Sequence, residues 1–453
     1  MAIHPFKKIY GNCVILANLR GQRTFPYAAR EEIERVRDAR VRWMVRYAAE
    51  TVPYYREFFG KRKIDPREIR TADDLKRLPL LTKKTVRQNP DLFNSESKWG
   101  KSAVIFQTRG STGFAVKFKH DVRSLLANVG FGERERDVIT RVGGRRLGYK
   151  EVYLGIPAWT IGEVWNFYRE WTFVPVRPQR KVILVTEPIE QIITEINDFK
   201  PDVIVGVGSF IELLFRTVFA RGLAMRNPRL AVYAGDAMSP EGKRFIEEQC
   251  GVAVLTQYNA CESFKIGFSC ERRKDIHLHD DLCHLRIVDN EGRDMPEGER
   301  GEAVISNLVN RGTVLLNYRM GDVASFSRER CGCGRNLRTI TALEGRVWDV
   351  VQLANGDFVH PHAVSGVFRG LNDVLRYQVV QHEPARFELK IMAKDREAYE
   401  RAVREVIPGL RGLLGNAVDI QPRFAEELLA VPDKFRAVIS LCAQRSAEQS
   451  GCV

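Results

Sequence analysis

The chain has 453 residues, a formal net charge of +14, and a composition of 44% hydrophobic and 28% charged residues. This length exceeds one ordinary core and indicates a large domain with a smaller one, or two to three domains of typical size. The composition is that of a soluble globular protein and argues against disorder. No apolar run is long enough to cross a membrane, and the N-terminus lacks the apolar stretch of a signal peptide, so we expect a cytoplasmic location.

The net charge limits the kinds of partner to expect, and the cysteines limit the kinds of cross-link or metal site. A strongly basic chain attracts nucleic acid, anionic membranes or acidic small molecules. The basic residues are dispersed, with no basic run interleaved with aromatics, which favours a solvated surface suited to a polyanionic cofactor over a nucleic-acid or membrane interface. The nine cysteines are odd in number and unevenly placed, so metal binding or burial is favoured over a disulfide framework.

In chain order, the first clear element is an amphipathic helix over 28–50 with an Arg-rich outer face. Pro53 ends it, and the aromatics that follow are expected to dock on the main body. From about 150 to 260, short apolar segments alternate with helical ones, which predicts a largely parallel sheet covered by helices. The expected strands are 152–156, 181–186, 202–208, 229–235 and 252–258, and the expected helices include 188–199 and 210–221.

The sequence pattern changes after about residue 283. Shorter strands with turns at 290–292 and 296–298 predict an antiparallel region. A break around 343–346 precedes a hairpin-like stretch and then a β/α segment. The residues after 345 suffice for a small separate domain.

A glycine- and hydroxyl-rich loop, TRGSTG at 108–113, follows an apolar run and precedes a helix-like segment that begins near Asp121. Backbone N–H groups and hydroxyls in such a loop can enclose phosphate oxygens. It matches neither the P-loop nor the GxGxxG pattern, and taken by itself it is better explained as an ordinary turn.

Two further segments carry a carboxylate next to an expected strand. YNACE at 258–262 offers an aromatic face for a base and a carboxylate for Mg²⁺. NYRMGD at 317–322 ends in a carboxylate suited to accept hydrogen bonds from ribose hydroxyls. Each also has a plain structural explanation, as a core tyrosine with a surface glutamate and as a turn with an ion pair.

The order of these motifs is more specific than any one of them. The series TRGSTG, YAGD at 233–236, YNACE, NYRMGD, LEGR at 343–346 and a lysine in VPDKFRAVIS at 431–440 resembles the adenylate-forming enzymes, most closely their phenylacetate-CoA ligase-like branch. The likeness runs from about residue 30 to 440. It implies an α/β protein with a large N-terminal domain of mixed β-sheets and flanking helices (1–345) and a small, mobile C-terminal α+β domain (346–453).

The resemblance also implies a role for each motif. The loop Thr108, Arg109, Gly110, Ser111, Thr112 and Gly113 would grip phosphate; Asp236 and Tyr258, with Asn259 and Cys261 beside it, would flank the adenine; Glu262 would bind Mg²⁺; Asp322 would hold the ribose; Arg346 would lie beside the nucleotide. Lys434 would bridge the substrate carboxylate and the α-phosphate. A cation and a metal are needed there because attack of a carboxylate on the phosphate brings two anions together.

The sequence departs from the family pattern at several positions. Arg109 replaces the family's Ser, and Ala115 replaces its Pro. Asn259 and Cys261 replace the Gly and Thr of the usual YGxTE, Asn317 replaces the Arg of RYRxGD, and Asp433 replaces the Gly before the lysine. Arg109 is a candidate additional phosphate ligand, and Cys261 is a weaker hydrogen-bond donor than Thr. A nucleotide-binding homologue with weak catalysis therefore stays open as an alternative.

A second kind of site is indicated by Cys270 and His277 together with Cys331 and Cys333. A Cys₃His set is typical of a closed tetrahedral structural zinc site, and members of the resembled branch share this arrangement. His279 is a possible substitute for His277, and simple burial of the cysteines is the alternative.

These features predict a ligase that activates a carboxylic acid with ATP and Mg²⁺ and passes the acyl group to coenzyme A, its C-terminal domain rotating about residues 345–349 between the two steps. An amide- or ester-forming synthetase that uses an amine or alcohol is the rival. The acid pocket is expected within 206–212 and 233–264, and aromatics in 164–173 favour an aryl or apolar acid, although core aromatics would look the same. A homodimer is expected by analogy alone.

Overall fold

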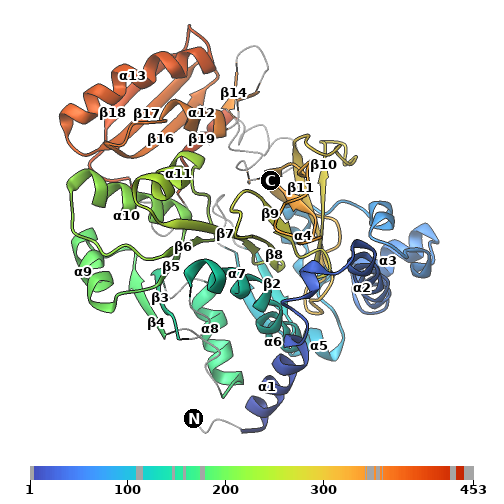
Figure 1. The fold of residues 1–453 in the computed structure, drawn as a ribbon. Helices are drawn as coiled ribbons and strands as arrows, with labels where there is room; N and C mark the ends of the chain where they lie inside the picture. The colour runs from blue at the N-terminus through green and yellow to red at the C-terminus, as the bar shows by residue number, and fades with distance from the viewer. Residues whose placement is uncertain are drawn as a thin grey trace.

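The computed structural model describes residues 5–108, 116–144, 148–156, 160–173, 179–341, 343, 351–353, 358–359, 361–428 and 435–442. Their strands form an eight-stranded sheet, a four-stranded sheet near the C-terminus, a three-stranded sheet and two hairpins (Figure 1). Helices and sheets are mixed throughout, which confirms the predicted α/β class. Within the described ranges, no helix is both long and apolar enough to cross a membrane.

The central sheet has the strand order β13-β9-β8-β7-β6-β5-β3-β4. Neighbouring strands from β4 to β7 pair in parallel, whereas β8, β9 and β13 pair antiparallel. The bounds are β3 (Lys150–Gly155), β4 (Gln179–Leu184), β5 (Val203–Gly206), β6 (Leu230–Tyr233), β7 (Ala253–Ala260), β8 (Phe264–Ser269), β9 (Ile276–Leu278) and β13 (Thr339–Ile340). All five strands predicted between 150 and 260 are confirmed, as is their parallel pairing.

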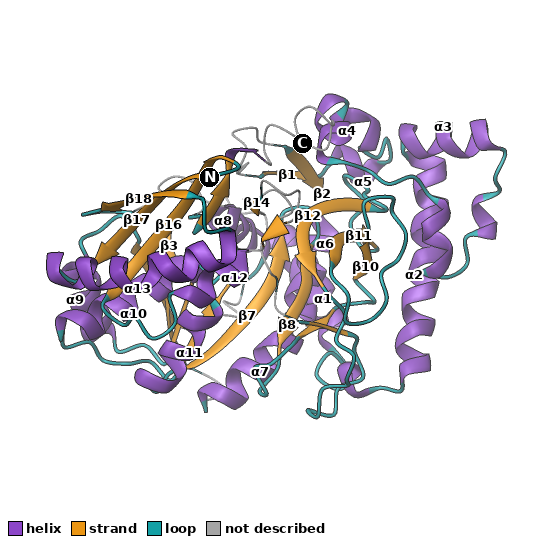
Figure 2. Cartoon of the chain, turned by 90° about the horizontal axis from the view of Figure 1, so that it is seen from above, coloured by secondary structure: helices purple, strands orange, loops and turns teal. Residues whose placement is uncertain are grey.

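Helices flank this sheet (Figure 2). They are α6 (Val122–Phe131), α7 (Glu133–Gly143), α8 (Thr160–Trp171), α9 (Ile189–Phe199), α10 (Gly208–Arg221) and α11 (Pro240–Gln249), and α1 (Pro5–Leu19) packs on α6 and α8. On α9, Ile192, Ile193 and Ile196 lie at helical spacing and are buried, so one face of the helix packs inward. Because α10 begins two residues after β5, its N-terminus lies at the carboxyl edge of the parallel strands, where ligands bind in such sheets.

The N-terminal segment packs on a three-stranded antiparallel sheet. It contains α2 (Arg30–Thr51), α3 (Pro53–Arg62), α4 (Lys83–Gln88) and α5 (Lys98–Lys101), and the sheet contains β10 (Cys283–Val288), β11 (Gly301–Asn307) and β12 (Tyr318–Ala324). The predicted helix ends as expected before Pro53, which starts α3. Tyr55 and Phe59 are buried in the shared core. Gly292 and Gly298 adopt positive φ angles of 85° and 83°, which confirms the two predicted turns.

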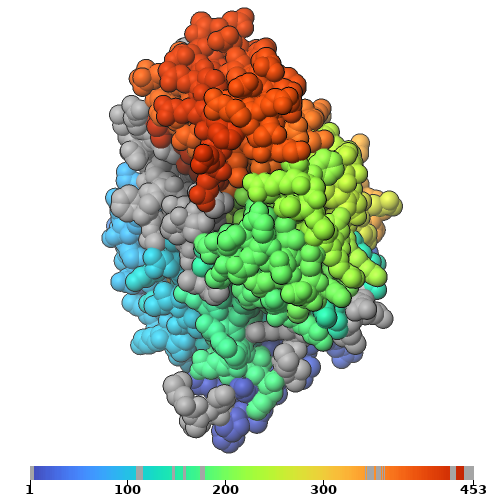
Figure 3. All heavy atoms as spheres, turned by 90° about the vertical axis from the view of Figure 1, so that its left-hand side faces the viewer, coloured from blue at the N-terminus to red at the C-terminus, as the bar shows by residue number. Residues whose placement is uncertain are grey.

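The C-terminal part has a sheet and a hydrophobic core of its own. Its elements are β14 (Val351–Gln352), β15 (Phe358–Val359), α12 (Pro361–Val367), β16 (Val374–Glu383), β17 (Arg386–Ala393), α13 (Arg396–Leu414), β18 (Asp419–Phe424) and β19 (Val438–Ser440). This part lies over α10 and α11 (Figures 1 and 3). The predicted boundary between 1–345 and 346–453 falls outside the described residues and stays a prediction.

Candidate functional site

A cavity of about 850 Å³ lies at the carboxyl ends of β5, β6 and β7, between them and the C-terminal part. Its lining includes every described residue to which the sequence assigned a nucleotide-binding or catalytic role. These are Thr108, Asp236, Tyr258, Asn259, Cys261, Glu262 and Asp322. The motifs come from distant parts of the chain, and the fold brings them together around one cavity.

Tyr258 near the end of β7 and Asp322 on β12 form a hydrogen bond in this cavity. The Tyr258 hydroxyl donates to Oδ2 of Asp322 at 2.7 Å. Burial raises the pKa of Tyr258 well above its usual value, and the Asp322 carboxylate raises it further, so the phenol stays protonated as a donor. The residues predicted to contact the base and the ribose are therefore direct neighbours.

Glu262 lies in the turn that joins β7 to β8. The Tyr318 hydroxyl is 3.5 Å from its Oε1, and the Asn307 amide donates to its backbone carbonyl at 3.3 Å. A carboxylate in a turn at the cavity wall, with its peptide held in place, is suited to hold a hard cation such as Mg²⁺.

His120 supports the same turn and was not singled out by the sequence. Its Nε2 donates to the carbonyl of Cys261 at 2.7 Å. Burial lowers the pKa of His120 to about 4, because a charged ring would lose its hydration among the rings of Phe106 and Phe264. The ring is therefore neutral near neutral pH. No local motif marks it, because it contacts the site from β2 (Lys117–His120) through tertiary packing.

Asp236 is fixed by the first turn of α10. The backbone N–H of Ser209 donates to its Oδ1 at 3.2 Å, and the Ser209 hydroxyl donates to Oδ2. Gly208 makes this approach possible, since a Cβ there would lie 2.8 Å from the backbone nitrogen of Met238. The carboxylate is thus held at the carboxyl edge of the sheet.

Thr108 closes the base of the glycine-rich loop. Its backbone N–H donates to the carbonyl of Val116 at 2.9 Å, and its hydroxyl accepts from the N–H of Val116 at 2.9 Å. The loop joins β1 (Val104–Gln107) to β2, so a strand intervenes before the helix that begins at Val122 with Asp121 as its N-cap. The sequence missed β2, a short strand with lysines at alternate positions.

Several predicted site residues lie outside the described residues. They are Arg109, Gly110, Ser111, Thr112, Gly113, Ala115, Arg346, Asp433 and Lys434. Their roles stay predictions.

Asn317, one of the departures from the family pattern, serves the fold. Its side chain is fully buried, and its Nδ2 donates to the carbonyls of Leu75 and Leu78 at 2.6 and 3.0 Å. Its φ of 56° is a left-handed conformation that asparagine tolerates better than most residues. The side chain therefore points into protein rather than toward the cavity.

The expected acid-binding segments also reach the cavity. Val164, Trp165 and Tyr168 of α8 line it, as do Gly206 to Phe210 in part and Tyr233. The sequence did not single out Lys265 and Glu135, which line the same space and form an ion pair at 2.6 Å. That this wall holds the acid stays a prediction.

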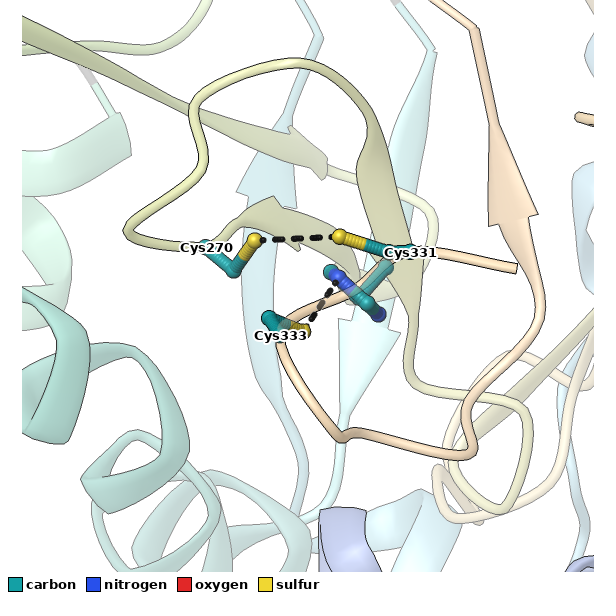
Figure 4. Close-up of side chains that lie close together, drawn as sticks. Cys270, Cys331 and Cys333 are labelled. Carbon is teal, nitrogen blue, oxygen red and sulfur yellow. Dashed lines mark hydrogen bonds between the residues drawn. The ribbon is translucent and has the colours of Figure 1, made fainter. Parts of the chain in front are cut away.

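The four residues of the predicted metal site come together in a separate place. One ligand atom from each of Cys270, His277, Cys331 and Cys333 lies within 4.8 Å of the others. Cys270 and Cys331 are 3.6 Å apart at sulfur, too far for a disulfide, and Cys333 sulfur is 3.4 Å from Nε2 of His277 (Figure 4). Tetrahedral zinc with bonds of about 2.3 Å to sulfur spaces its sulfur ligands by roughly 3.8 Å. The spacing fits one such ion.

His279, the possible substitute for His277, belongs to another network. Its Nε2 is 3.1 Å from Glu135 and its Nδ1 is 3.4 Å from Arg134. His277, by contrast, has a buried Nδ1 without a hydrogen-bond partner among the described residues, and its Nε2 faces the sulfurs. A histidine so oriented is suited to coordinate metal through Nε2.

Known proteins with similar sequences are acid-CoA ligases, as the resemblance of the motifs implied. No family model matches the chain. It is 25% identical over 392 residues to a phenylacetate-coenzyme A ligase of Thermus thermophilus, covering 83% of this chain and 85% of that enzyme. It is also 25% identical over 342 residues to that of Escherichia coli, covering 72% and 73%. Over most of its length the chain is therefore similar to phenylacetate-coenzyme A ligases.

Solved structures show the same fold. A 2-hydroxyisobutyryl-CoA ligase in the postadenylation state matches this chain with a TM-score of 0.73 at 16% identity, covering 92% of both chains. The same ligase in its thioesterification state gives 0.59 at 17% identity, covering 95% of this chain and 94% of the other. The match extends across both the large sheet and the C-terminal part.

Proposed function

We propose that the protein activates a carboxylic acid with ATP to an acyl-adenylate and then transfers the acyl group to coenzyme A. The observation that carries this proposal is the single cavity that collects seven motif residues, among them the Tyr258–Asp322 pair and Glu262. The named relatives, which are phenylacetate-coenzyme A ligases, support coenzyme A as the acceptor.

The first step would join the two substrates in this cavity. A carboxylate oxygen of the acid attacks the α-phosphorus of ATP, the bond to the bridging oxygen breaks, and pyrophosphate leaves. Asp322 would hold the ribose hydroxyls, while Asp236 and Tyr258 flank the base. Lys434 would offset the negative charge that accumulates as the two anions meet.

A bound Mg²⁺ ion and the glycine-rich loop would assist this step. Glu262 would hold Mg²⁺, which when bound supplies positive charge beside the phosphates. The loop 109–113 would bind the leaving pyrophosphate through backbone N–H groups and hydroxyls, with Arg109 as an extra cation.

In the second step the thiolate of coenzyme A attacks the acyl carbon, and AMP leaves with the bonding electron pair. We infer that the C-terminal part turns about residues 345–349 between the steps, withdrawing Lys434. The existence of two named states of the 2-hydroxyisobutyryl-CoA ligase supports such a change.

We further propose that Cys270, His277, Cys331 and Cys333 hold a structural zinc ion. The donor set of three thiols and one imidazole, and their spacing, support zinc. All four positions of a tetrahedron would be filled by protein, so this ion would stabilise the fold and take no part in the reaction. A homodimer and a cytoplasmic location stay predictions.

The proposal is tested by supplying a panel of aryl and aliphatic acids with ATP and Mg²⁺, with and without coenzyme A. We expect pyrophosphate and acyl-adenylate with the right acid alone, and acyl-CoA with AMP once coenzyme A is added. An amide formed from an amine without coenzyme A would instead establish the rival synthetase. In the same assay, an Arg109→Ser variant with unchanged ATP affinity would show that this arginine does not bind phosphate.

A further inference from the structure

Arg376 on β16 reaches from the C-terminal sheet to the wall of the cavity. Its Nη2 donates to the backbone carbonyl of Ser209 at 2.5 Å, and its Nη1 donates to the carbonyl of Leu428 at 2.7 Å. The guanidinium also lies 4.3 Å from the centre of the Phe435 ring. One side chain therefore contacts α10 and both segments that flank residues 429–434.

Burying the charged guanidinium of Arg376 costs free energy, so its hydrogen bonds must offset the lost hydration. The residue is only 8% exposed, and burial lowers its pKa to about 10, while Asp236 and Glu212 act in the opposite direction. It stays charged at neutral pH. A buried cation is tolerated where its hydrogen bonds are made, and here two of them go to backbone carbonyls on different elements.

The contact with Ser209 connects Arg376 to the predicted adenine site. Ser209 donates from its N–H and its hydroxyl to Asp236, and its carbonyl accepts from Arg376. A shift of the Arg376 side chain would therefore move the peptide that holds Asp236.

The contact with Leu428 connects the same arginine to the segment that carries Lys434. Gln378, two residues along β16 and on the same face of the strand, donates to the carbonyl of Arg436 at 3.0 Å. The two side chains hold one described residue on each side of 429–434, which are Leu428 and Arg436.

We propose that Arg376 is a positioning residue for the adenylation step: it fixes the C-terminal sheet against the cavity wall at Ser209 and holds the backbone at Leu428. This inference rests on the proposed function, because it assigns Arg376 to one of its two half-reactions. Arg376 need not touch the reacting atoms. Its effect comes through the placement of the groups that do.

The test measures the two half-reactions separately in Arg376→Ala and Arg376→Lys. For Arg376→Ala we expect kcat for acyl-adenylate formation to fall at least about tenfold, because misplacement by about 1 Å is enough to cost this much or more. KM for ATP should change less than about threefold. Thioester formation from supplied acyl-adenylate and coenzyme A should stay within about twofold of wild type, because the step does not need this placement.

Arg376→Lys and Arg401→Ala sharpen the test. A lysine keeps the charge but cannot reach two carbonyls with a planar fork, so it should recover only part of the adenylation rate. Arg401, an exposed residue of α13 that pairs with Glu397 and Asp373, should be dispensable for both steps. Equal losses in both half-reactions, or a full adenylation rate in Arg376→Ala, would overturn the proposal.

Amide hydrogen exchange separates this inference from the proposed function. Arg376→Ala should speed exchange of the Ser209 amide, which is bonded to Asp236, and unchanged exchange there would overturn the contact's role. If wild type forms no acyl-adenylate from any acid, the proposed function fails, and exchange at Ser209 then decides the contact alone. If Arg376→Ala does not fold, Arg376→Lys carries the same readouts.

Discussion

The Cys/His cluster and the cavity are assembled in different ways. The cluster takes four side chains from two short stretches of chain, 270–277 and 331–333, and their ligand atoms all lie within 4.8 Å of one another. The cavity takes its walls from residues as far apart as Ile15 and Val438, including the large sheet, β12 and the C-terminal sheet. A change in the cluster should therefore act on stability, whereas a change at the cavity should act on rate with little effect on stability.

Lys434→Ala should give the largest effect on the cavity side of this comparison. Removing a cation that offsets charge in the transition state costs about 10²–10³-fold in kcat. We expect such a loss in acyl-adenylate formation, measured as pyrophosphate release, with an unchanged melting temperature. Lys394→Ala, an exposed lysine of the C-terminal part, is the matched control. A comparable loss in that control, or none in Lys434→Ala, would contradict the assignment.

Cys331→Ser should give the largest effect on the cluster side. With one ligand removed, bound zinc should fall from one equivalent per chain toward none, and the free energy of unfolding should fall by about 3 kcal/mol or more. Metal analysis and denaturant unfolding measure the two changes. The exposed Cys13 provides the control, since Cys13→Ser should alter neither. Purified wild-type protein without any bound metal and with unchanged stability in a chelator would count against the zinc site.

Tyr258→Phe should act more weakly and only on nucleotide binding. The change removes the 2.7 Å hydrogen bond to Asp322, and such a bond is worth about 1–2 kcal/mol. We expect KM for ATP to rise about five- to thirtyfold, with kcat less affected. Tyr10→Phe, on the exposed side of α1, should leave both constants unchanged. An unchanged KM in Tyr258→Phe would place the nucleotide elsewhere.

The last prediction concerns His120 and the pH dependence of stability, with no effect on rate at neutral pH. Its pKa is about 4 in the folded protein and near 6.5 when unfolded, so the unfolded chain binds more protons between these values. The free energy of unfolding should therefore fall as pH drops from about 6.5 to about 4, by at most about 1.4 kcal/mol per pH unit from this group. His120→Gln should flatten the slope, and His382→Gln, on the more exposed His382, should not. Equal slopes in all three proteins would contradict this account.

The local sequence pattern was sufficient to predict many of the strands and turns. The strands β3 to β7 are short apolar runs between helical segments, and the turns at Gly292 and Gly298 are marked by glycine itself. Asp236 was expected at the cavity because it follows a strand of the parallel sheet, whereas Asp322 lies within β12 of another sheet and reaches the cavity through tertiary packing. The clustering of Cys270, His277, Cys331 and Cys333 was expected because three thiols and an imidazole form a typical zinc ligand set, and their role as metal ligands stays a prediction.

What the sequence did not reveal depends on contacts between distant residues. Nothing local in LRYQ marks Arg376 as a partner of Ser209, 167 residues away. His120 and Asn317 are fixed by hydrogen bonds to the backbone carbonyls of Cys261 and Leu75, which are 141 and 242 residues away. The strand β2 is only four residues long, and two of its four residues are lysines. Its alternating pattern is therefore too short to distinguish from a loop.

The central claim is that adenylation precedes transfer to coenzyme A in this cavity. Mass spectrometry of a reaction with ATP, Mg²⁺ and the preferred acid tests it most directly, because it identifies each product. The account predicts acyl-adenylate and pyrophosphate before coenzyme A is added, and acyl-CoA and AMP in equal amounts afterwards. ADP and phosphate as products, or acyl-CoA formed without an adenylate intermediate, would contradict it.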